Sequence, residues 1–396
     1  MVHLSYHRKE VNVVNLINQR VKDIEISGIR KFSNMVAPYK DAISLTIGQP
    51  DFPTPLHIKE AAKRAIDDDY TVYTHNAGFI ELRRACSEYM KEKYSVSYNP
   101  ETEVIVTAGA SEAIDVSLRT ILTEGCEVIL PGPVYPGYEP IIKLCGAKPI
   151  HVDVTNNGFK LTAELLAPHI TDRTRCVILP YPSNPTGVTL TSRELEDIAR
   201  LLKGKDILVL ADEIYSELVF DEEHTSIAAF LREQTIIING LSKSHSMTGW
   251  RIGFLYAPEP LCGQILKVHQ YNVTCASSIS QMAAISALTA GKDDPIAMKE
   301  EYKKRRDYVY ERLQKMGLDV VKPDGAFYFL VRMPDGFASS FDFALQLVQE
   351  NNVAVVPGSA FSQEGEGFFR ISYAYSMERL AEGLNRIEAF LKKHRA

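Results

Sequence analysis

A lysine and an arginine eight residues apart are the side chains whose types and spacing first suggest chemistry. Lys243 follows the apolar run 235–239, which predicts a buried parallel strand, and Arg251 opens a second predicted strand over 252–256. A lysine amine at the mouth of a buried sheet can form a Schiff base with an aldehyde, and an arginine can grip a phosphate. The pair suits a covalently held aldehyde cofactor that carries a phosphate, although an isolated lysine is far more often a solvated surface residue.

Composition and charge limit the other kinds of function. The chain has 396 residues, 45% apolar and 24% charged, which is enough for two domains with a sizeable core. The net charge of −6 and the lack of a basic stripe argue against binding to nucleic acid or to a membrane surface. The six cysteines and ten histidines show no metal-ligand spacing, so we expect no metal site and reduced thiols in a cytoplasmic protein. We expect neither a membrane-spanning segment nor a signal peptide.

The chain between residues 103 and 256 alternates predicted strands with helical segments. Seven runs are predicted as strands, at residues 104–107, 127–130, 149–152, 176–179, 207–210, 236–238 and 252–256. Because most of these runs are apolar throughout, we predict an α/β fold with a seven-stranded, mostly parallel sheet covered on both faces. Ligands of such sheets bind outside the carboxyl ends of the strands, so the residues just after each strand are the candidates for function.

Two segments that follow the first strands of this series could contact a flat, anionic ligand. The residues from Ala108 to Ser111 open a predicted helix over 112–122, where free N–H groups and the helix dipole attract an anion. A plain helix cap, made by Ser111, explains the same pattern. Tyr135 is presented by a stiff proline turn, and its ring could stack on a flat cofactor or fill the core.

Two later loops and one late strand add polar side chains. Asn184 can donate an amide hydrogen bond, and the proline that follows it makes a cis bond plausible. Asp212 ends an apolar strand, where an unpaired carboxylate is costly, so it could pair with a protonated ring nitrogen within reach of Tyr215. Arg370 lies in the apolar run 367–373 and requires an anion, which could be a ligand or a protein carboxylate.

A competing interpretation of the Asp212 segment is the magnesium-binding strand of a P-loop ATPase, since four apolar residues precede Asp212-Glu213. That interpretation requires Gly-x-x-x-x-Gly-Lys-[Ser/Thr] upstream, and neither Gly204-Lys205 nor Gly291-Lys292 completes it. No Gly-x-Gly-x-x-Gly follows a predicted strand, so a dinucleotide-binding fold is also disfavoured.

The regular alternation of predicted strands and helices ends in the C-terminal part of the chain. Predicted helices over 261–271, 278–288 and 298–316 precede predicted strands at 318–321, 326–331, 353–357 and 367–373 and a last helix over 377–392. We predict a partly disordered N-terminal extension (1–25), a segment that joins the small domain (26–50), a large cofactor-binding domain (51–288) and a small α+β domain (289–396). Gly48 opens a loop of closely spaced turns whose backbone could approach a ligand or simply link the domains.

These residues together resemble a known family. The motifs that carry the resemblance are Ser242-Lys243 with Arg251-x-Gly253, Asn184-Pro-Thr-Gly187, Asp212-x-x-Tyr215 and Phe369-Arg-Ile-Ser372. Their order and spacing are similar to those of the pyridoxal-phosphate-dependent aminotransferases of class I and II, the aspartate aminotransferase superfamily. The resemblance runs from about residue 26 to the C-terminus. It implies fold type I, transamination between an amino acid and a 2-oxo acid, and a homodimer with shared active sites.

The resemblance also implies a role for each matching residue in the chemistry. Lys243 would link to the cofactor and then move the proton between substrate and cofactor. Asp212 would hold the pyridine nitrogen protonated. Arg370 would bind the substrate α-carboxylate, helped by Asn184 and by the backbone of Gly48.

The remaining matches concern the cofactor ring and its phosphate. Tyr215 and Asn184 would hydrogen-bond the ring oxygen, and the ring of Tyr135 would stack on the cofactor. The phosphate would be held by Gly109, Ala110, Ser111, Ser242, Arg251 and, across the subunit interface, Tyr73. Gly240 departs from the pattern, because some members have a hydroxyl residue there, so the phosphate site is expected to be one contact short.

Three segments resemble one bacterial branch of the family, which acts on N-acetyl-L,L-2,6-diaminopimelate in lysine biosynthesis. They are residues 45–52, 131–140 and 239–251. The branch implies 2-oxoglutarate as the amino acceptor. Aspartate or aromatic amino acids as donors, and a β-lyase on the same fold, are the alternatives. A non-catalytic relative in a transcription regulator would need a fused DNA-binding domain, for which residues 1–25 are too short.

Overall fold

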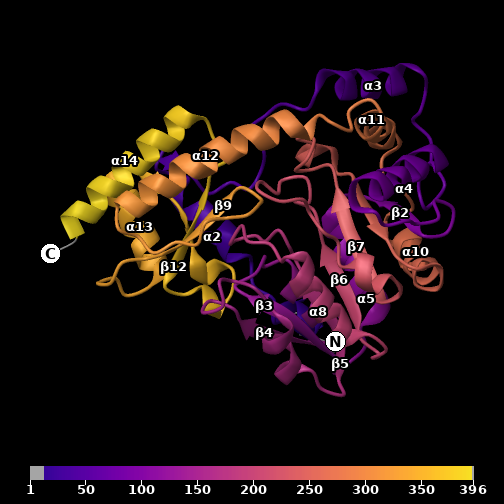
Figure 1. Ribbon diagram of the computed structural model, residues 1–396, viewed down its shortest axis with the longest axis horizontal. Helices are drawn as coiled ribbons and strands as arrows, with labels where there is room; N and C mark the ends of the chain where they lie inside the picture. The colour runs from indigo at the N-terminus through magenta and orange to yellow at the C-terminus, as the bar shows by residue number, and fades with distance from the viewer. Residues whose placement is uncertain (1–12, 395–396) are drawn as a thin grey trace, which may run out of the picture.

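A seven-stranded sheet forms the centre of the computed structural model, which describes residues 13–394 (Figure 1). Its strands are β2 (Val104–Thr107), β3 (Glu127–Gly132), β4 (Lys148–Asp153), β5 (Thr174–Leu179), β6 (Leu208–Asp212), β7 (Thr235–Gly240) and β8 (Gly253–Tyr256). Their order is β2-β8-β7-β6-β5-β3-β4. Strand β8 is antiparallel to both of its neighbours, and the other pairs are parallel. The predicted α/β fold with a mostly parallel seven-stranded sheet is confirmed.

Helices cover both faces of this sheet. One face packs on α5 (Ala110–Ile121), α6 (Tyr138–Leu144) and α10 (Glu259–Val273). The other face packs on α3 (Leu56–Asp67), α4 (Ile80–Tyr94), α11 (Ser278–Leu288), α7 (Ala163–Leu166), α8 (Ser192–Leu202) and α9 (Ala228–Leu231). Along β7, Ile236 and Ile238 face the first helical layer and Ile237 faces the second. Burial on both faces explains why the strands are apolar without alternation.

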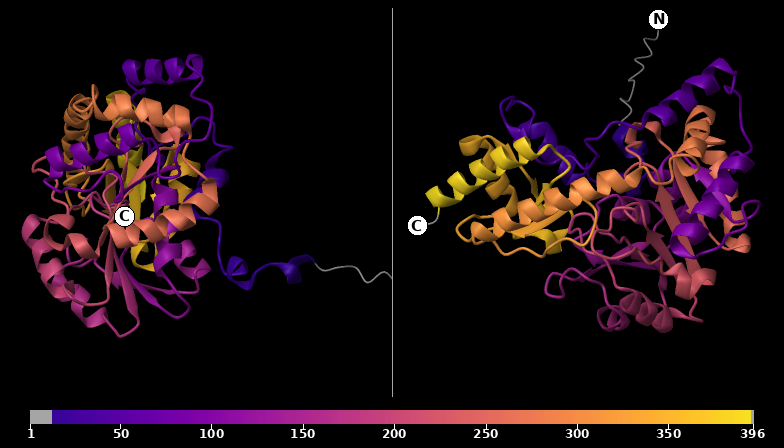
Figure 2. Two further views of the ribbon diagram at one scale, coloured as in Figure 1. Left: turned by 90° about the vertical axis from the view of Figure 1, so that its right-hand side faces the viewer. Right: turned by 45° about the horizontal axis from the view of Figure 1, so that its top comes forward.

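A second core lies beside the large sheet and joins the two ends of the chain. It contains the antiparallel sheet β11-β12-β9 (Val356–Pro357, Phe368–Ser372, Tyr328–Arg332) and the parallel pair of β1 (Ile43–Ser44) with β10 (Val353–Ala354). Its helices are α2 (Gly28–Val36), α12 (Pro295–Lys315), α13 (Ser340–Asn351) and α14 (Met377–His394). Phe32 and Leu45 are buried with Leu347, Phe369 and Phe390. Figure 2 shows the indigo N-terminal helix beside the yellow C-terminal elements.

The remaining elements are short. They are η1 (Val13–Leu16), α1 (Gln19–Lys22), η2 (Ala167–His169), η3 (Arg232–Gln234), η4 (Thr248–Trp250), η5 (Gly358–Ala360) and η6 (Gln363–Gly365). Of the extension that was predicted to be partly disordered (1–25), residues 1–12 lie outside the described residues, and residues 13–25 include η1 and α1. Between residues 13 and 394, no helix combines the length and apolar character needed to cross a membrane.

Four details of the predicted elements were wrong. The run 318–321 is not a strand, because only Val320 makes an isolated bridge, to Val331. The run 353–357 is divided between two sheets, as β10 and β11. Helix α5 begins before residue 112 and is capped by Gly109, so Ser111 is not its cap. Arg251 has a φ of 53°, a left-handed conformation, so the strand after it begins only at Gly253.

Candidate active site

A cavity of about 890 Å³ lies at the carboxyl ends of β6 and β7 and reaches β9 and β12 of the small sheet. It brings together predicted residues from distant parts of the chain: Gly48, Ala110, Ser111, Tyr135, Asn184, Asp212, Tyr215, Ser242, Lys243, Arg251 and Arg370. Two predicted residues do not line it. Gly109 lies directly beneath the wall, and the Tyr73 side chain is 84% exposed elsewhere on this chain.

Lys243 follows the end of β7, and its amine points into the cavity. Its Nζ donates a hydrogen bond to the carbonyl oxygen of Gly48 at 2.7 Å. Burial lowers the pKa of Lys243 from the ordinary 10.5 to about 8, and the positive charge of Arg370 acts in the same direction, whereas Asp212 opposes both. The amine is therefore far more easily deprotonated than a surface lysine, as a nucleophile or proton carrier requires.

Asp212 is the last residue of β6 and is buried at the bottom of the cavity. The hydroxyl of Tyr138 donates to its Oδ2 at 2.6 Å, and the backbone N–H of Ile214 donates to its Oδ1 at 3.2 Å. Burial raises the pKa of Asp212, and these two hydrogen bonds oppose that rise because they favour the ionised carboxylate. Asp212 can therefore offer a buried negative charge to a cationic group in the cavity.

The N-terminus of α5 and the Arg251 side chain lie together at one end of the cavity, an arrangement that would attract an anion. Gly109 has a φ of +88°, and a Cβ there would lie 2.5 Å from Nη2 of Arg251. Only glycine therefore lets the guanidinium approach the helix terminus this closely. Ala110 and Ser111 are the first residues of the helix, where N–H groups are unpaired by the helix itself, and Ser242 lines the same cavity.

Gly240, where the family resemblance predicts a missing hydroxyl contact, lies at the end of β7 opposite Gly253 of β8. A Cβ on Gly240 would lie 3.1 Å from the Cα of Gly253 and 3.2 Å from the carbonyl oxygen of Ile252. A larger side chain would thus press on the backbone of β8. The close approach of the two strands accounts for glycine at this position.

Four tyrosines line the cavity within the described residues: Tyr135, Tyr138, Tyr215 and Tyr328. The hydroxyl groups of Tyr215 and Tyr328 are hydrogen-bonded at 2.7 Å, and both rings are buried. The ring of Tyr135 lies over Gly137, where a Cβ would come within 2.3 Å of Tyr135 Cε1. Tyr328 also lies against Gly48, since a Cβ on Gly48 would meet its hydroxyl at 2.3 Å. The backbone at residue 48 therefore packs directly against the Tyr328 hydroxyl at the cavity wall.

Arg370 is buried in the middle of β12, yet both of its hydrogen-bond acceptors are neutral. Its Nη1 donates to Oδ1 of Asn184 at 2.8 Å, and its Nη2 donates to the carbonyl oxygen of Thr46 at 2.5 Å. Nε of Arg370 has no partner within the described residues. Such an uncompensated guanidinium requires an anion, and the predicted alternative of a protein carboxylate is not what holds it.

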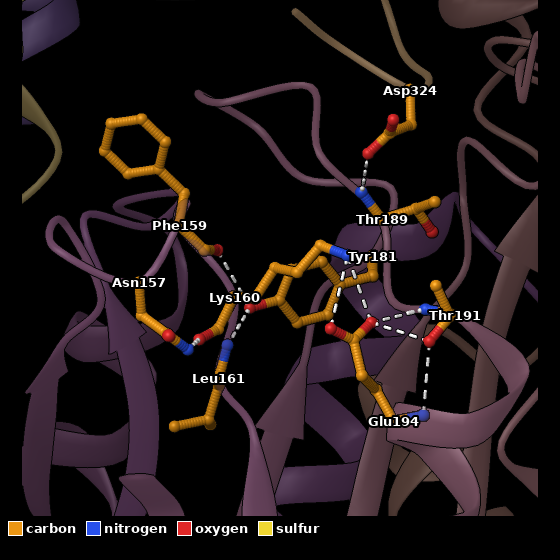
Figure 3. Close-up of polar contacts among 9 residues, drawn as sticks. All are labelled: Asn157, Phe159, Lys160, Leu161, Tyr181, Thr189, Thr191, Glu194 and Asp324. Atoms are coloured by element: carbon orange, nitrogen blue, oxygen red, sulfur yellow. Dashed lines mark hydrogen bonds and ion pairs between the residues drawn. The ribbon is translucent and has the colours of Figure 1, made fainter. Parts of the chain in front are cut away.

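The segment that presents Asn184 is held from two sides (Figure 3). The hydroxyl of Tyr181 donates to the carbonyl oxygen of Phe159 at 3.2 Å and accepts from the N–H of Leu161 at 2.9 Å. The N–H of Thr189 donates to Asp324 at 3.2 Å. The Asn184–Pro185 bond is cis, as the sequence made plausible. These contacts fix the loop and so the amide that meets Arg370.

Tyr138 and Tyr328 are two site residues that the sequence did not reveal. Tyr138 stands three residues after Tyr135 and opens α6 after the stiff proline turn, which was the available signal. Tyr328 begins β9 and carried no such signal, because its partner Tyr215 is 113 residues away in the chain. Long-range contacts of this kind depend on how the two sheets meet.

Known proteins match the chain over most of its length. Residues 40–387 match the family described as aminotransferase class I and II. A probable N-acetyl-LL-diaminopimelate aminotransferase of Bacillus subtilis (strain 168) is 62% identical, over 96% of this chain and 97% of that protein. The aromatic-amino-acid aminotransferase 2 of Thermococcus litoralis is 41% identical, over 95% of this chain and 98% of that protein. The solved aspartate aminotransferase of Thermus thermophilus with maleate has a TM-score of 0.90 at 34% identity, over 94% of this chain and 99% of that chain.

The family match spans both the large sheet and the small one, and the similar proteins are covered nearly end to end. The cavity also combines a lysine of lowered pKa, a buried carboxylate and a helix N-terminus that would attract an anion. The chain belongs to the class I and II aminotransferases, which are pyridoxal-phosphate-dependent enzymes of fold type I.

Proposed function

We propose that this aminotransferase transfers the amino group of N-acetyl-L,L-2,6-diaminopimelate to 2-oxoglutarate in lysine biosynthesis. The proposed substrate rests on the 62% identity, over nearly the whole of both chains, to the probable N-acetyl-LL-diaminopimelate aminotransferase of B. subtilis. The aromatic-amino-acid aminotransferase of T. litoralis is similar at 41% identity. Aromatic amino acids and aspartate are therefore the second candidate donors.

The residues of the cavity fit pyridoxal phosphate. When bound, the cofactor supplies an aldehyde for a lysine amine and an electron-withdrawing ring. Lys243 offers the amine, and Asp212 offers a buried carboxylate to the ring nitrogen. The N-terminus of α5, with the Arg251 guanidinium packed against Gly109, suits a phosphate group.

Further residues are assigned to the cofactor in the same proposal. Ala110, Ser111 and Ser242 add hydrogen-bond donors to the phosphate, and Tyr135 stacks on the ring. Tyr215 and Asn184 hydrogen-bond the ring oxygen. All of these residues line the cavity.

Arg370 and Lys243 act on the substrate itself in this proposal. The α-carboxylate pairs with the Arg370 guanidinium, whose present acceptors are neutral. The carbonyl of Gly48 keeps Nζ of Lys243 within the cavity through its 2.7 Å hydrogen bond. Nζ of Lys243 is then the group placed to take the proton from the substrate Cα, because burial keeps its pKa near 8.

The charges of the cavity wall favour an acetylated donor over a free diamine. Among the described residues that line the cavity, Asp212 is the only acidic one, and its carboxylate is already bonded to Tyr138. A distal ammonium would therefore be desolvated without a partner, which costs several kcal/mol. A neutral acetamide costs much less once it is hydrogen-bonded. We expect at least about a tenfold preference in kcat/KM for the N-acetyl donor, equivalent to about 1.4 kcal/mol.

The test is a comparison of donors with 2-oxoglutarate as acceptor. N-acetyl-L,L-diaminopimelate, free L,L-diaminopimelate, aspartate and phenylalanine are assayed under identical conditions. Equal rates for the two diaminopimelates, or a preference for aspartate or phenylalanine, would overturn the proposed substrate and leave the aminotransferase activity in place. Elimination of a donor's side chain without any 2-oxo acid would point to a β-lyase instead.

Assembly and location belong to the same proposal: a cytoplasmic homodimer in which Tyr73 reaches the phosphate in the neighbouring subunit. Tyr73, Val72 and Tyr271 expose 84%, 74% and 86% of their areas, and exposed apolar side chains of this size suit burial against a second copy. Six free cysteines suit a reducing compartment. Hybrid dimers of Tyr73→Phe and Lys243→Ala subunits test the shared site, and hybrids whose two sites behave independently would contradict it.

A further inference from the structure

Four positively charged side chains line the cavity, and one of them has no task in the proposed reaction. Lys243 serves the cofactor aldehyde, Arg251 its phosphate, and Arg370 the substrate α-carboxylate. The fourth is Arg30, in the first turn of α2, and Asp212 is the only acid among the lining residues between positions 13 and 394. The wall therefore carries more positive charge than the cofactor and one carboxylate account for.

The Arg30 side chain is free to meet a ligand. It is exposed, and within residues 13–394 no hydrogen bond or ion pair engages its guanidinium. Its neighbour Lys31 differs in both respects, because its Nζ pairs with Glu25 at 2.5 Å and it does not line the cavity. Arg30 and Lys31 thus form a natural pair for comparison on one helix turn.

The packing of α2 fixes where Arg30 stands relative to Arg370. Strand β11 pairs with β12, with Val356 opposite Arg370, and η5 follows β11 directly. Helix α2 packs on both β11 and η5. Its first residue, Gly28, lies so close that a Cβ there would be 2.9 Å from the Cα of Ala360. Arg30 and Arg370 are therefore carried by one packed unit and face the same cavity.

We propose that Arg30 binds the second carboxylate of the substrates, the one farther from the reacting carbon; the inference rests on the proposed function. Glutamate, 2-oxoglutarate and N-acetyl-L,L-diaminopimelate all carry such a carboxylate, but in the last it lies two carbons farther along the chain. A guanidinium held in one place by hydrogen bonds to the protein could pair with the distal carboxylate of substrates of one chain length only. The long, unpaired side chain of Arg30 can follow both lengths and still pair in a bidentate manner.

The test compares inert five-carbon ligands that differ by one carboxylate. Inhibition constants of glutarate and pentanoate are measured on the holoenzyme of the wild type and of the Arg30→Gln, Arg30→Lys and Lys31→Gln variants. We expect Arg30→Gln to weaken glutarate about tenfold and pentanoate hardly at all. Arg30→Lys should recover part of the loss because it keeps the charge, and Lys31→Gln should match the wild type.

The kinetic counterpart uses glutamate and L-norvaline, which differ by the same carboxylate. Arg30→Gln should raise the KM of glutamate with little change in kcat and leave norvaline unchanged. Equal effects on the dicarboxylate and the monocarboxylate, or equal effects of Arg30→Gln and Lys31→Gln, would overturn the inference. The wild-type assay with N-acetyl-L,L-diaminopimelate is independent. A failure of that donor alone removes the proposed substrate, whereas a failure of the glutarate comparison alone removes the role of Arg30.

Discussion

Replacement of Tyr138 by phenylalanine tests how the site keeps Asp212 ionised. The change removes one hydroxyl, which donates to Asp212 Oδ2 at 2.6 Å, and retains the ring that packs edge-on against Tyr135 at 5.5 Å. A hydrogen bond to a charged group contributes about 1.5 to 3 kcal/mol. Its loss therefore raises the pKa of Asp212 further, because the ionised carboxylate loses a stabilising donor.

The direction of the pH effect follows from the charge that the site requires. Burial already raises the pKa of Asp212, and the Tyr138 hydroxyl is the largest opposing influence. In the variant, the carboxylate takes up its proton at a higher pH, so activity is lost earlier as the pH falls. The acidic limb of the kcat/KM profile should move to higher pH, and the cofactor should dissociate more readily.

Tyr373→Phe is the matched control for this experiment. Its hydroxyl is also buried and donates at 3.1 Å, but to the backbone carbonyl of Ala326 in the small core. This control should lower stability by about 1 kcal/mol and leave the pH profile unchanged. An unaltered acidic limb and unaltered cofactor affinity in Tyr138→Phe would refute the reasoning about Asp212.

Three further outcomes follow from the same contacts. In the cofactor-free protein, capture of the cofactor aldehyde should rise with pH as the Lys243 amine loses its proton, with a midpoint near pH 8. A stopped-flow titration with its midpoint near the ordinary 10.5 would contradict this. His269→Gln should weaken cofactor retention about tenfold, as measured by equilibrium dialysis. The reason is that Nδ1 of the fully buried His269 contacts Oε1 of Glu112 at 2.7 Å, and Glu112 lies in the first turn of α5. Gly48→Ala should raise the KM of amino donors, since the new Cβ would lie 2.3 Å from the Tyr328 hydroxyl; an unchanged KM would show that the tyrosine moves without consequence.

The large sheet was predictable because its strands are buried on both faces and read as apolar runs. Asp212 and the lysine turn could be placed for the same reason, since they follow such runs directly. The reversed direction of β8 could not be predicted, because an apolar run carries no sign of strand direction. The misassigned run 318–321 is apolar at its ends but lies beside β9 without pairing along its length.

Contacts between segments that are distant in the sequence could not be predicted from sequence patterns. Tyr138 meets Asp212 across 74 residues, and Arg370 meets Thr46 across 324. Both contacts arise only when the sheets and helices have packed. The domain boundaries at residues 50 and 288 and the role of Tyr73 stay predictions, since a single chain does not test them.

The most direct test of the central claim is borohydride reduction of the holoenzyme, followed by peptide mapping with mass spectrometry. If Lys243 holds the cofactor, the reduced cofactor will be found on the peptide that contains Lys243. Prior incubation with N-acetyl-L,L-diaminopimelate, without a 2-oxo acid, should abolish this label because the donor converts the cofactor to its amine form. A label on another lysine, or a Lys243 label that the donor leaves intact, would contradict the account.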